Sequence, residues 1–442
     1  EYQAIFGQTV ESASLQYSYL TSTAANNYFR QGGTSLLVTR VTHGDFAPAF
    51  TSGSTAGSGN SGIMNLETSE SFQIQTISEG TIMNNYATSD AASGTLALGT
   101  ADNVRWQIAG VNTGSGTFSL IVRQGNDTSN SPSILETFND LSLDPFQPNY
   151  IERVIGNTTH EIAQDGADYY VKSTGDYVNR SKYISVKSVL TPTPNFFNNA
   201  GGVNSGSAGT LYSKFIPVAS SGSFTGATGA NIQASMSPAK FNSNIIDTNI
   251  QGLTATDYSA SISLLNNKDD YNFNVVVAPG LIGDSSFTNS LVQVNSLVAL
   301  AENRQDCITV VDPSAYGKTV SQTVASATAF DSSYAATYWP WLQAIDPTSG
   351  MTTWSPASAF IPGVYSFTDA SSEPWFAPAG LVRGALGNVI RAEQRLTSGQ
   401  RDTLYSGNVN PIATFPASGV VVFGQKTLQR RASALDRVNV RR

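Results

Sequence analysis

The chain has 442 residues, of which 24 are Lys or Arg and 32 are Asp or Glu, so its formal net charge is −8. Charged residues are 13% of the chain, about half the usual share for globular domains, and hydrophobic residues are 40%, which is enough for a sizeable core and excludes disorder of the whole chain. Cys307 is the only cysteine and His43 and His160 are the only histidines, which excludes a disulfide framework and a cysteine metal cluster and disfavours a histidine-based triad.

The first residues predict a helix and then a strand. Leu20, Ala24 and Tyr28 recur at helical spacing before the glycine stop at Gly32. Ser35–Val41 is rich in β-branched and aliphatic residues and predicts a strand. Residues 51–62, made of Thr, Ser, Gly, Ala and Asn, predict a flexible linker.

From this linker to about residue 240, β-branched and aromatic runs between turn signals predict a β-rich region. The predicted strands are Ser71–Ile77, Val104–Ala109, Thr117–Arg123, Tyr169–Lys172, Tyr183–Leu190 and Leu211–Val218. Two further stretches rich in Gly, Ser and Asn, at 198–209 and 219–230, predict loops that close the region.

After residue 240 the pattern alternates between helices and apolar strands. Helices are predicted at Phe287–Asn303, Val320–Phe330 and Leu381–Leu396, and strands at Tyr271–Ala278, Cys307–Asp312, Tyr334–Ala344 and Gly419–Phe423. Strands that are apolar along their length are typical of a sheet buried on both faces. The sequence therefore predicts an α/β core, a mixed sheet covered by helices, discontinuous in sequence at 1–48 and 241–442 and carrying an inserted β-rich region at 49–240.

The strongest enzymatic candidate is the loop from Asp312 to Thr319, which follows a strand, opens a helix and ends Gly-Lys-Thr. A phosphate-binding loop needs glycine first, so that backbone N–H groups converge on the anion. Here Asp312 would repel a phosphate and Pro313 lacks an N–H. A strand-to-helix turn with Lys318 in solvent is the favoured interpretation, and a phosphate- or nucleotide-binding enzyme using this loop stays open as an alternative.

No other pattern indicates catalysis, a cofactor or a metal ligand. The sequence lacks a Gly-x-Ser-x-Gly elbow, a His-Glu-x-x-His motif and a calcium loop. No apolar run approaches the roughly 20 residues of a bilayer span, so membrane insertion is not expected. The chain is expected to be no enzyme and to need no cofactor.

Two features suggest surfaces for contact with other molecules. Four of the five tryptophans lie close together in sequence: Trp339, Trp341, Trp354 and Trp375. Such residues form either a large aromatic core or a subunit interface. A third alternative is a surface glycan-binding module that uses exposed aromatic side chains. The end of the chain is basic, with a net charge of +5 from Gln425 onward, carried by Lys426, Arg430, Arg431, Arg437, Arg441 and Arg442 against Asp436. This end suits an acidic partner surface, whereas phosphates would be repelled by the acidic remainder, so direct contact with nucleic acid is not expected.

Several ordered segments make the chain similar to the tail sheath proteins of contractile-tailed bacteriophages (myoviruses). They are 28–33 (YFRQGG), 139–145 (NDLSLDP), 333–341 (SYAATYWPW), 362–365 (PGVY), 375–380 (WFAPAG), 409–416 (VNPIATFP) and 438–442 (VNVRR). The chain departs from the family at Phe367, where an arginine is usual, and at Ala417-Ser418, where Gly-Arg is usual.

The resemblance implies a structural subunit of a contractile tail sheath. Such subunits form six-membered rings stacked helically around the tail tube protein, contact baseplate and tail terminator proteins, and contract to drive the tube through the host envelope during genome ejection. It implies a virion protein assembled in the host cytoplasm, with the inserted region facing outward. Because the chain starts at Glu1 without methionine, we expect a piece of a longer protein. Since the family continues before Glu1 and beyond the final Val-Arg-Arg, the resemblance implies a central fragment that lacks the N- and C-terminal arms.

Overall fold

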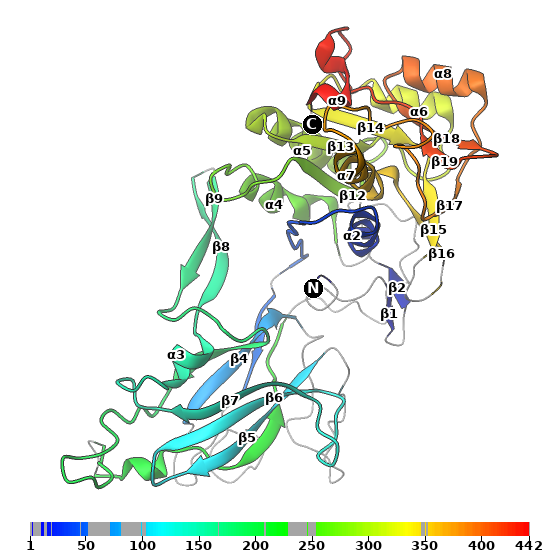
Figure 1. The fold of residues 1–442 in the computed structure, drawn as a ribbon. Helices are drawn as coiled ribbons and strands as arrows, with labels where there is room; N and C mark the ends of the chain where they lie inside the picture. Colours follow the sequence, from blue (N-terminus) through cyan, green and yellow to red (C-terminus); the bar gives the residue numbers. More distant parts are fainter. Residues whose placement is uncertain are drawn as a thin grey trace. The chain divides into compact units, whose positions relative to one another are not determined.

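The computed structural model describes residues 2, 10–12, 16–18, 20–44, 46–51, 71–80, 99, 103–166, 168–206, 209–228, 245, 253–345, 350 and 352–441. The chain forms two compact units (Figure 1). The first, here called the α/β unit, combines Glu1–His43 with Ile232–Arg442, and the second, here called the β unit, is Gly44–Asn231. The boundaries between the two units lie at residues 43/44 and 231/232. The sequence pattern predicts them at 48/49 and 240/241.

A five-stranded mixed sheet forms the centre of the α/β unit. Its strand order is β12-β13-β14-β18-β19, with bounds Val275–Ile282, Ile308–Asp312, Ala335–Trp339, Asn410–Phe415 and Gly419–Val422. The first four strands run parallel and β19 pairs antiparallel with β18. The β14–β18 ladder is short and joins only Tyr338 to Asn410 and Trp339 to Pro411.

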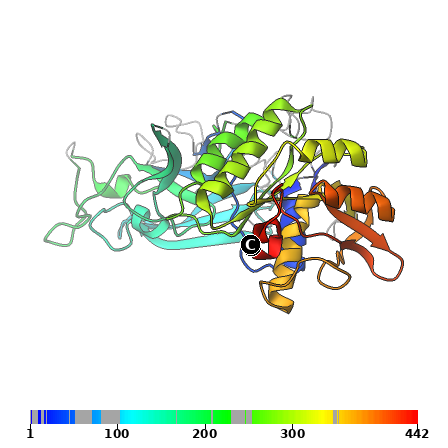
Figure 2. The ribbon, with the colours of Figure 1, turned by 90° about the horizontal axis from the view of Figure 1, so that it is seen from above.

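Helices cover both faces of this sheet because the strands present apolar side chains on each face. In β13, Ile308 and Val310 belong to one apolar cluster and Val311 to the other. The Val311 face is packed by α4 (Tyr258–Leu264), α5 (Thr288–Arg304), α6 (Val320–Ala327) and α8 (Ser398–Ser406), and the opposite face by α2 (Leu20–Arg30), the 3₁₀ turn η4 (Ala357–Ala359) and α7 (Ile361–Ser371). Figure 2 shows the green α5 and the golden α7 on opposite sides of the sheet.

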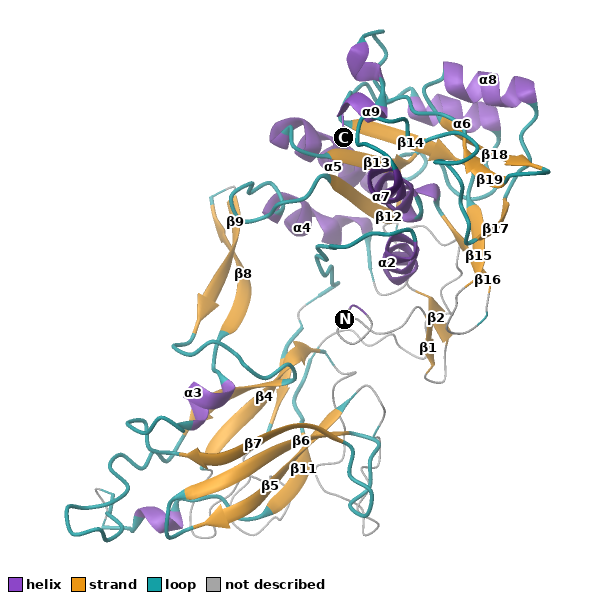
Figure 3. Ribbon diagram, in the orientation of Figure 1, coloured by secondary structure: helices purple, strands orange, loops and turns teal. Residues whose placement is uncertain are grey.

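Smaller elements complete the α/β unit (Figure 3). They are the hairpin β1–β2 (Val10–Ser12 and Gln16–Ser18), the antiparallel sheet β16-β15-β17 (Thr352–Ser355, Leu342–Ile345 and Val389–Ala392), the 3₁₀ turns η3 (Ala255–Asp257) and η5 (Ala434–Asp436), and the short helix α9 (Val438–Arg441). β15 belongs to a different sheet from β14, although only Pro340 and Trp341 separate the two strands.

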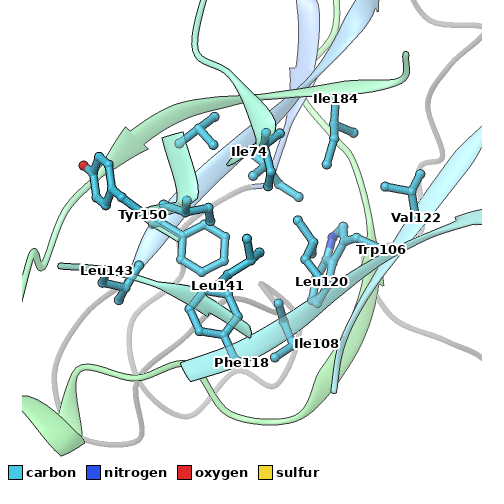
Figure 4. Close-up of a cluster of buried hydrophobic side chains, with 14 of the residues drawn as sticks. Ile74, Trp106, Ile108, Phe118, Leu120, Val122, Leu141, Leu143, Tyr150 and Ile184 are labelled. Atoms are coloured by element: carbon cyan, nitrogen blue, oxygen red, sulfur yellow. The ribbon is translucent and has the colours of Figure 1, made fainter. Parts of the chain in front are cut away.

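Antiparallel sheets around one apolar cluster form the β unit. A three-stranded sheet has the order β10-β4-β3 (Ile184–Val189, Phe72–Glu79 and Pro48–Phe50), and a four-stranded sheet has the order β11-β5-β6-β7 (Ser220–Ser223, Val104–Asn112, Thr117–Gln124 and Ile134–Ser142). The unit also contains α3 (Ile151–Ile155), η2 (Tyr212–Lys214) and the hairpin β8–β9 (Thr159–Asp165 and Asp168–Thr174). Figure 4 shows this core, with Trp106, Phe118 and Leu120 among its side chains. The rings of Phe72 and Phe118 are stacked, with their centres 5.3 Å apart.

A buried ion cluster joins β5 and β6 to the turn that follows them. Arg105, Arg123 and Asp127 have side chains that are at most 3% exposed. Arg123 donates to both carboxylate oxygens of Asp127, at 2.7 and 2.9 Å, and Arg105 donates to one at 3.3 Å. The carboxylate thus neutralises part of the charge of two buried guanidinium groups.

The coarse prediction of a mixed sheet with covering helices is confirmed. Three predicted elements are wrong: Ser35–Val41 forms no strand, Leu211–Val218 contains the turn η2, and Leu381–Leu396 contains turns and β17 in place of a helix. The predicted strand Tyr334–Ala344 is two strands, because Pro340 offers no N–H to a ladder. Of the predicted linker at 51–62, residues 52–62 lie outside the described residues.

Candidate functional site

The loop from Asp312 to Thr319 does not present an open anion site. The N–H of Gly317 donates to Oε1 of Glu393 at 2.6 Å, and the Nζ of Lys318 lies 3.5 Å from a carboxylate oxygen of Asp284. Thr319 caps α6 by accepting from the N–H of Gln322. The two groups that a phosphate would require are therefore already occupied by the chain's own carboxylates.

The carboxylates around this loop form hydrogen bonds and an ion pair with neighbouring segments of the chain. Burial raises the pKa of Asp312 to about 7, although the N–H and hydroxyl of Ser358 donate to it at 3.1 and 2.5 Å. Burial alone would raise the pKa of Asp284, but hydrogen bonds from Ser286 and the charge of Lys318 hold it below its usual value. These contacts tie the ends of β12 and β13 to η4 and α6.

Metal sites and bilayer-crossing helices each require a recognisable arrangement of side chains. Among them, no group of three or more His, Cys, Asp and Glu side chains is placed to hold a metal ion. None of the helices in the same residues combines the length and the hydrophobicity that a bilayer crossing requires.

The four clustered tryptophans have different environments. Trp339 and Trp341 are 1% and 2% exposed and lie in the core, where Trp341 donates its indole N–H to the carbonyl of Ser314 at 3.0 Å. Trp354 is half-buried, with the guanidinium of Arg391 5.3 Å from its ring centre. Trp375 is 66% exposed. Core packing makes Trp339 and Trp341 inaccessible to a partner in this conformation, and both Tyr316 and Arg391 lie against the Trp354 ring. An interface role for the aromatics therefore stays an expectation for Trp375 and for the exposed part of Trp354.

The basic C-terminal segment folds back onto the central sheet. Leu428, 1% exposed, donates its N–H to the carbonyl of Ala335 at 2.8 Å, and Thr427 donates to the carbonyl of Asp436 at 3.0 Å. Val438 is fully buried in the α7 face of the core. The segment is thereby part of the α/β unit, and it fixes the directions in which its basic side chains point.

Some basic side chains of this segment contact other residues of the chain, and others are exposed to solvent. Lys426 donates to the carbonyl of Tyr405 at 2.8 Å, and burial, followed by the charge of Arg437, lowers its pKa. Arg437 pairs with Asp436 at 2.9 Å, and Arg441 lies 3.7 Å from the ring centre of Tyr334. Of the remaining basic residues, Arg430 and Arg431 are exposed, and Arg442 is outside the described residues.

An apolar groove that the sequence did not indicate lies at the turn between β18 and β19. It has a volume of about 480 Å³ and is lined by Leu381, Phe415, Pro416, Ala417, Ser418 and Phe423. Leu381 and Phe423 are 52% and 44% exposed, and the neighbouring Val382 is 76% exposed. The wrongly predicted helix over 381–396 concealed this site, because a helical pattern places Leu381 in the core.

The guanidinium of Arg401 lies over two of the aromatic rings that line this groove. It lies 5.4 Å from the ring centre of Phe415 and 5.8 Å from that of Phe423, and it donates to the carbonyl of Leu396 at 3.2 Å. Within the described part of the chain, Arg401 forms no ion pair. The groove thus offers an apolar floor beside a positive charge.

These features are an exposed tryptophan, an exposed basic segment and an apolar groove on one α/β unit. Residues 251–428 match the family model described as the phage tail sheath protein central domain. This segment, 178 of the 442 residues, is therefore similar to the central domain of phage tail sheath proteins. The matched residues include β12 to β19, and therefore the whole central sheet.

Two curated relatives each align with 42–43% of this chain. The tail sheath protein of Enterobacteria phage T4 is 30% identical over 207 residues, which are 43% of this chain and 31% of the relative. The tail sheath protein of Vibrio phage KVP40 is 29% identical over 217 residues, which are 42% of this chain and 31% of the relative. The alignments span about a third of the length of these relatives. Among solved structures, a sheath tail protein from Listeria innocua covers 97% of this chain and 65% of its own, at 11% identity and a TM-score of 0.49.

Proposed function

We propose that this chain is part of a structural subunit of a contractile tail sheath, which polymerises around a tail tube and shortens to drive the tube through a host envelope. The observation that carries the proposal is the family match over the whole central sheet. Work in such a device comes from the difference in packing between two assembled states, so the subunit needs rigid cores and exposed contact surfaces.

The contact surfaces follow from the exposed groups of the α/β unit. The proposed contacts with neighbouring copies are Trp375, the exposed part of Trp354 and the basic residues of the C-terminal segment. Among the basic residues, Arg430 and Arg431 are the most available to an acidic surface. Partners of the whole protein would be further copies in six-membered stacked rings, a tube protein, and the baseplate and terminator proteins. The protein would be a virion component assembled in the host cytoplasm.

The β unit is the proposed insertion, carried outward from a core that is discontinuous in sequence. Its chain segment, 44–231, interrupts the α/β unit, and it holds fifteen acidic against eight basic residues. The α/β unit is nearly neutral, with seventeen acidic and sixteen basic residues. An acidic outer unit favours solubility and keeps non-specific contacts between assembled particles weak.

The enzymatic and glycan-binding alternatives are less consistent with the contacts. Lys318 and the N–H of Gly317 already face carboxylates, so we expect no enzymatic use of this loop. Titration calorimetry with ATP and GTP tests this: micromolar binding that disappears in Lys318→Ala would support the enzyme. A glycan array tests the other alternative, since binding lost in Trp375→Ala would support a glycan-binding module.

Electron microscopy of the full-length protein tests the proposed function directly. Purified protein should form rings or tubes of regular diameter, and Trp375→Ala should reduce their number while leaving the far-ultraviolet circular dichroism unchanged. Val292→Ala, at a 51% exposed apolar position on α5, serves as the matched control. Protein that stays monomeric under every condition, with both ends of the natural chain present, would contradict the proposal.

A further inference from the structure

The β8–β9 hairpin is exposed on both faces, which is costly for two strands alone. Every residue of β8 except Ala163, and every residue of β9 except Tyr169, is exposed. In Figure 1 the hairpin extends away from the sheets of its own unit. A two-stranded hairpin is marginally stable in water, and its apolar side chains Ile162, Tyr170 and Val171 are 50%, 42% and 42% exposed. Tyr170 lies on one face and Ile162 and Val171 on the other, so a partner that covers the Tyr170 face would remove the part of this cost that comes from Tyr170.

The charges of the hairpin are also unbalanced at its tip. Asp165 and Asp168 stand directly opposite each other in the ladder, and like charges in such a pair repel. Further from the tip, Glu161 is paired with Lys172 at 3.0 Å. Within the described residues, neither Asp165 nor Asp168 forms an ion pair. A cation held opposite the tip would relieve the repulsion.

One face of the hairpin combines this acidic tip with an aromatic ring. Because side chains alternate between the faces of a strand, Tyr170 and Ala163 share the face of Asp165 and Asp168. The order along this face is therefore two carboxylates at the tip and then a phenol ring. Its partner needs a cationic group beside an apolar depression.

The groove of the α/β unit has this combination. Phe415, Phe423 and Leu381 line a depression of about 480 Å³, within the roughly 300–1,000 Å³ typical of sites that hold drug-sized ligands, so an aromatic side chain fits. Arg401 stands over both rings of that depression and forms no ion pair within the described part of the chain. The apolar surface and the sign of the charge both complement the hairpin tip.

We propose that the tip of the β8–β9 hairpin of one copy docks into the groove of a second copy, with Tyr170 between Leu381 and Phe423 and with Asp165 and Asp168 facing Arg401. This inference rests on the proposed function and deepens it, since it names a contact through which copies recognise each other. The acidic β unit would thereby contribute to assembly as well as to solubility.

Charge exchange between two variants tests the contact. Arg401→Glu and the double variant Asp165→Arg/Asp168→Arg each place like charges on both sides, and each should weaken self-association in low salt by about tenfold or more in sedimentation velocity. An equimolar mixture of the two contains the wild-type pairing of an acidic tip with Arg401, so association should return in the mixture. Recovery in the mixture also shows that both variants fold.

Two matched controls isolate the site. Arg153→Glu reverses an arginine over an aromatic ring outside the groove, that of Tyr177, and Glu161→Lys/Lys172→Glu exchanges the hairpin charges while keeping their pair. Both should associate like wild type, and wild-type association should weaken as salt rises from about 0.05 to 0.5 M. The inference is overturned if wild type stays monomeric up to millimolar concentration, if the two variants associate as wild type does, or if the mixture fails to recover. Normal tubes from full-length charge variants would overturn this contact alone, whereas full-length wild type without tubes would overturn the proposed function.

Discussion

Asn410 connects the weakest part of the central sheet to the C-terminal segment, and its removal should loosen both. Its side chain is fully buried and belongs to β18. The amide nitrogen donates to the carbonyls of Thr337 at 3.1 Å and Lys426 at 2.7 Å, and the amide oxygen accepts from the N–H of Lys426 at 2.6 Å. One side chain thus joins β14, β18 and the returning segment, where the β14–β18 ladder has only two residue pairs.

The substitution Asn410→Ala removes all three hydrogen bonds. At about 1 kcal/mol net for each, the free energy of unfolding of the α/β unit should fall by about 3 kcal/mol, and by more where a buried carbonyl or N–H stays unpaired. Four of the five tryptophans belong to the α/β unit, so their fluorescence during urea unfolding reports mainly on that unit. Trypsin should also cleave the variant faster after Arg430 and Arg431, because the segment that carries them is held less firmly.

Asn439→Ala is the matched control, because its amide makes one hydrogen bond, to the carbonyl of Trp375 at 2.9 Å. That variant should lose less than about 1 kcal/mol. If Asn410→Ala shifts the urea midpoint no more than Asn439→Ala and leaves the cleavage rate unchanged, the amide does not hold the segment and the reasoning fails.

Three further predictions concern the buried charges and the exposed aromatic. Asp127→Asn leaves two buried guanidinium groups without their carboxylate, so calorimetry should show the β unit destabilised by about 3–5 kcal/mol, and a loss below 1 kcal/mol would contradict this. Burial raises the pKa of Asp312 to about 7, above its unfolded value of 3.8, so the free energy of unfolding should fall as the pH rises from about 4 to 7. In urea titrations, Asp312→Asn should make the free energy of unfolding depend less on pH over this range. An unchanged pH dependence would assign the effect to another group. Trp375→Ala should change the free energy of unfolding by less than about 0.5 kcal/mol, because the ring is 66% exposed, and a loss above 2 kcal/mol would show that the ring belongs to the core.

Much of the central sheet could be predicted because its strands are continuous apolar runs. Val275–Val277, Cys307–Asp312 and Gly419–Phe423 correspond to β12, β13 and β19, and the apolar face of Phe287–Asn303 corresponds to α5. Strands that are buried on both faces do not alternate between apolar and polar residues, so the sequence pattern reveals them. The strand β12 nevertheless continues to Ile282, beyond Ala278 where the predicted strand ends, after a shift in its register with β13.

The errors arise where tertiary contacts override the local pattern. Residues 380–386 lie against β19: Gly380 donates to the carbonyl of Val422, and Val422 donates to the carbonyl of Gly384. A Cβ on Gly384 would lie 2.5 Å from the carbonyl oxygen of Val422, so the close approach requires glycine there. Apolar spacing alone predicted a helix over these residues, and the groove beside Leu381 was missed for the same reason.

The candidate contact residues could be predicted only in part. Composition and spacing identified the tryptophans and the basic end, but exposure depends on the fold: Trp375 is open while Trp339 and Trp341 are enclosed. Arg401 gave no signal in the sequence, because its position over Phe415 and Phe423 depends on α8 packing against β18. Contact between copies is encoded in such long-range arrangements, which no local pattern reports.

The most direct test of the central claim is the length of the assembled sheath before and after triggering, measured by cryo-electron microscopy of particles that contain the full-length protein. The account predicts two populations, one long and narrow and one shorter and wider, with the α/β unit folded alike in both and no nucleotide needed for the change. A sheath of one fixed length, or shortening that stops when nucleotide is withdrawn, would contradict it.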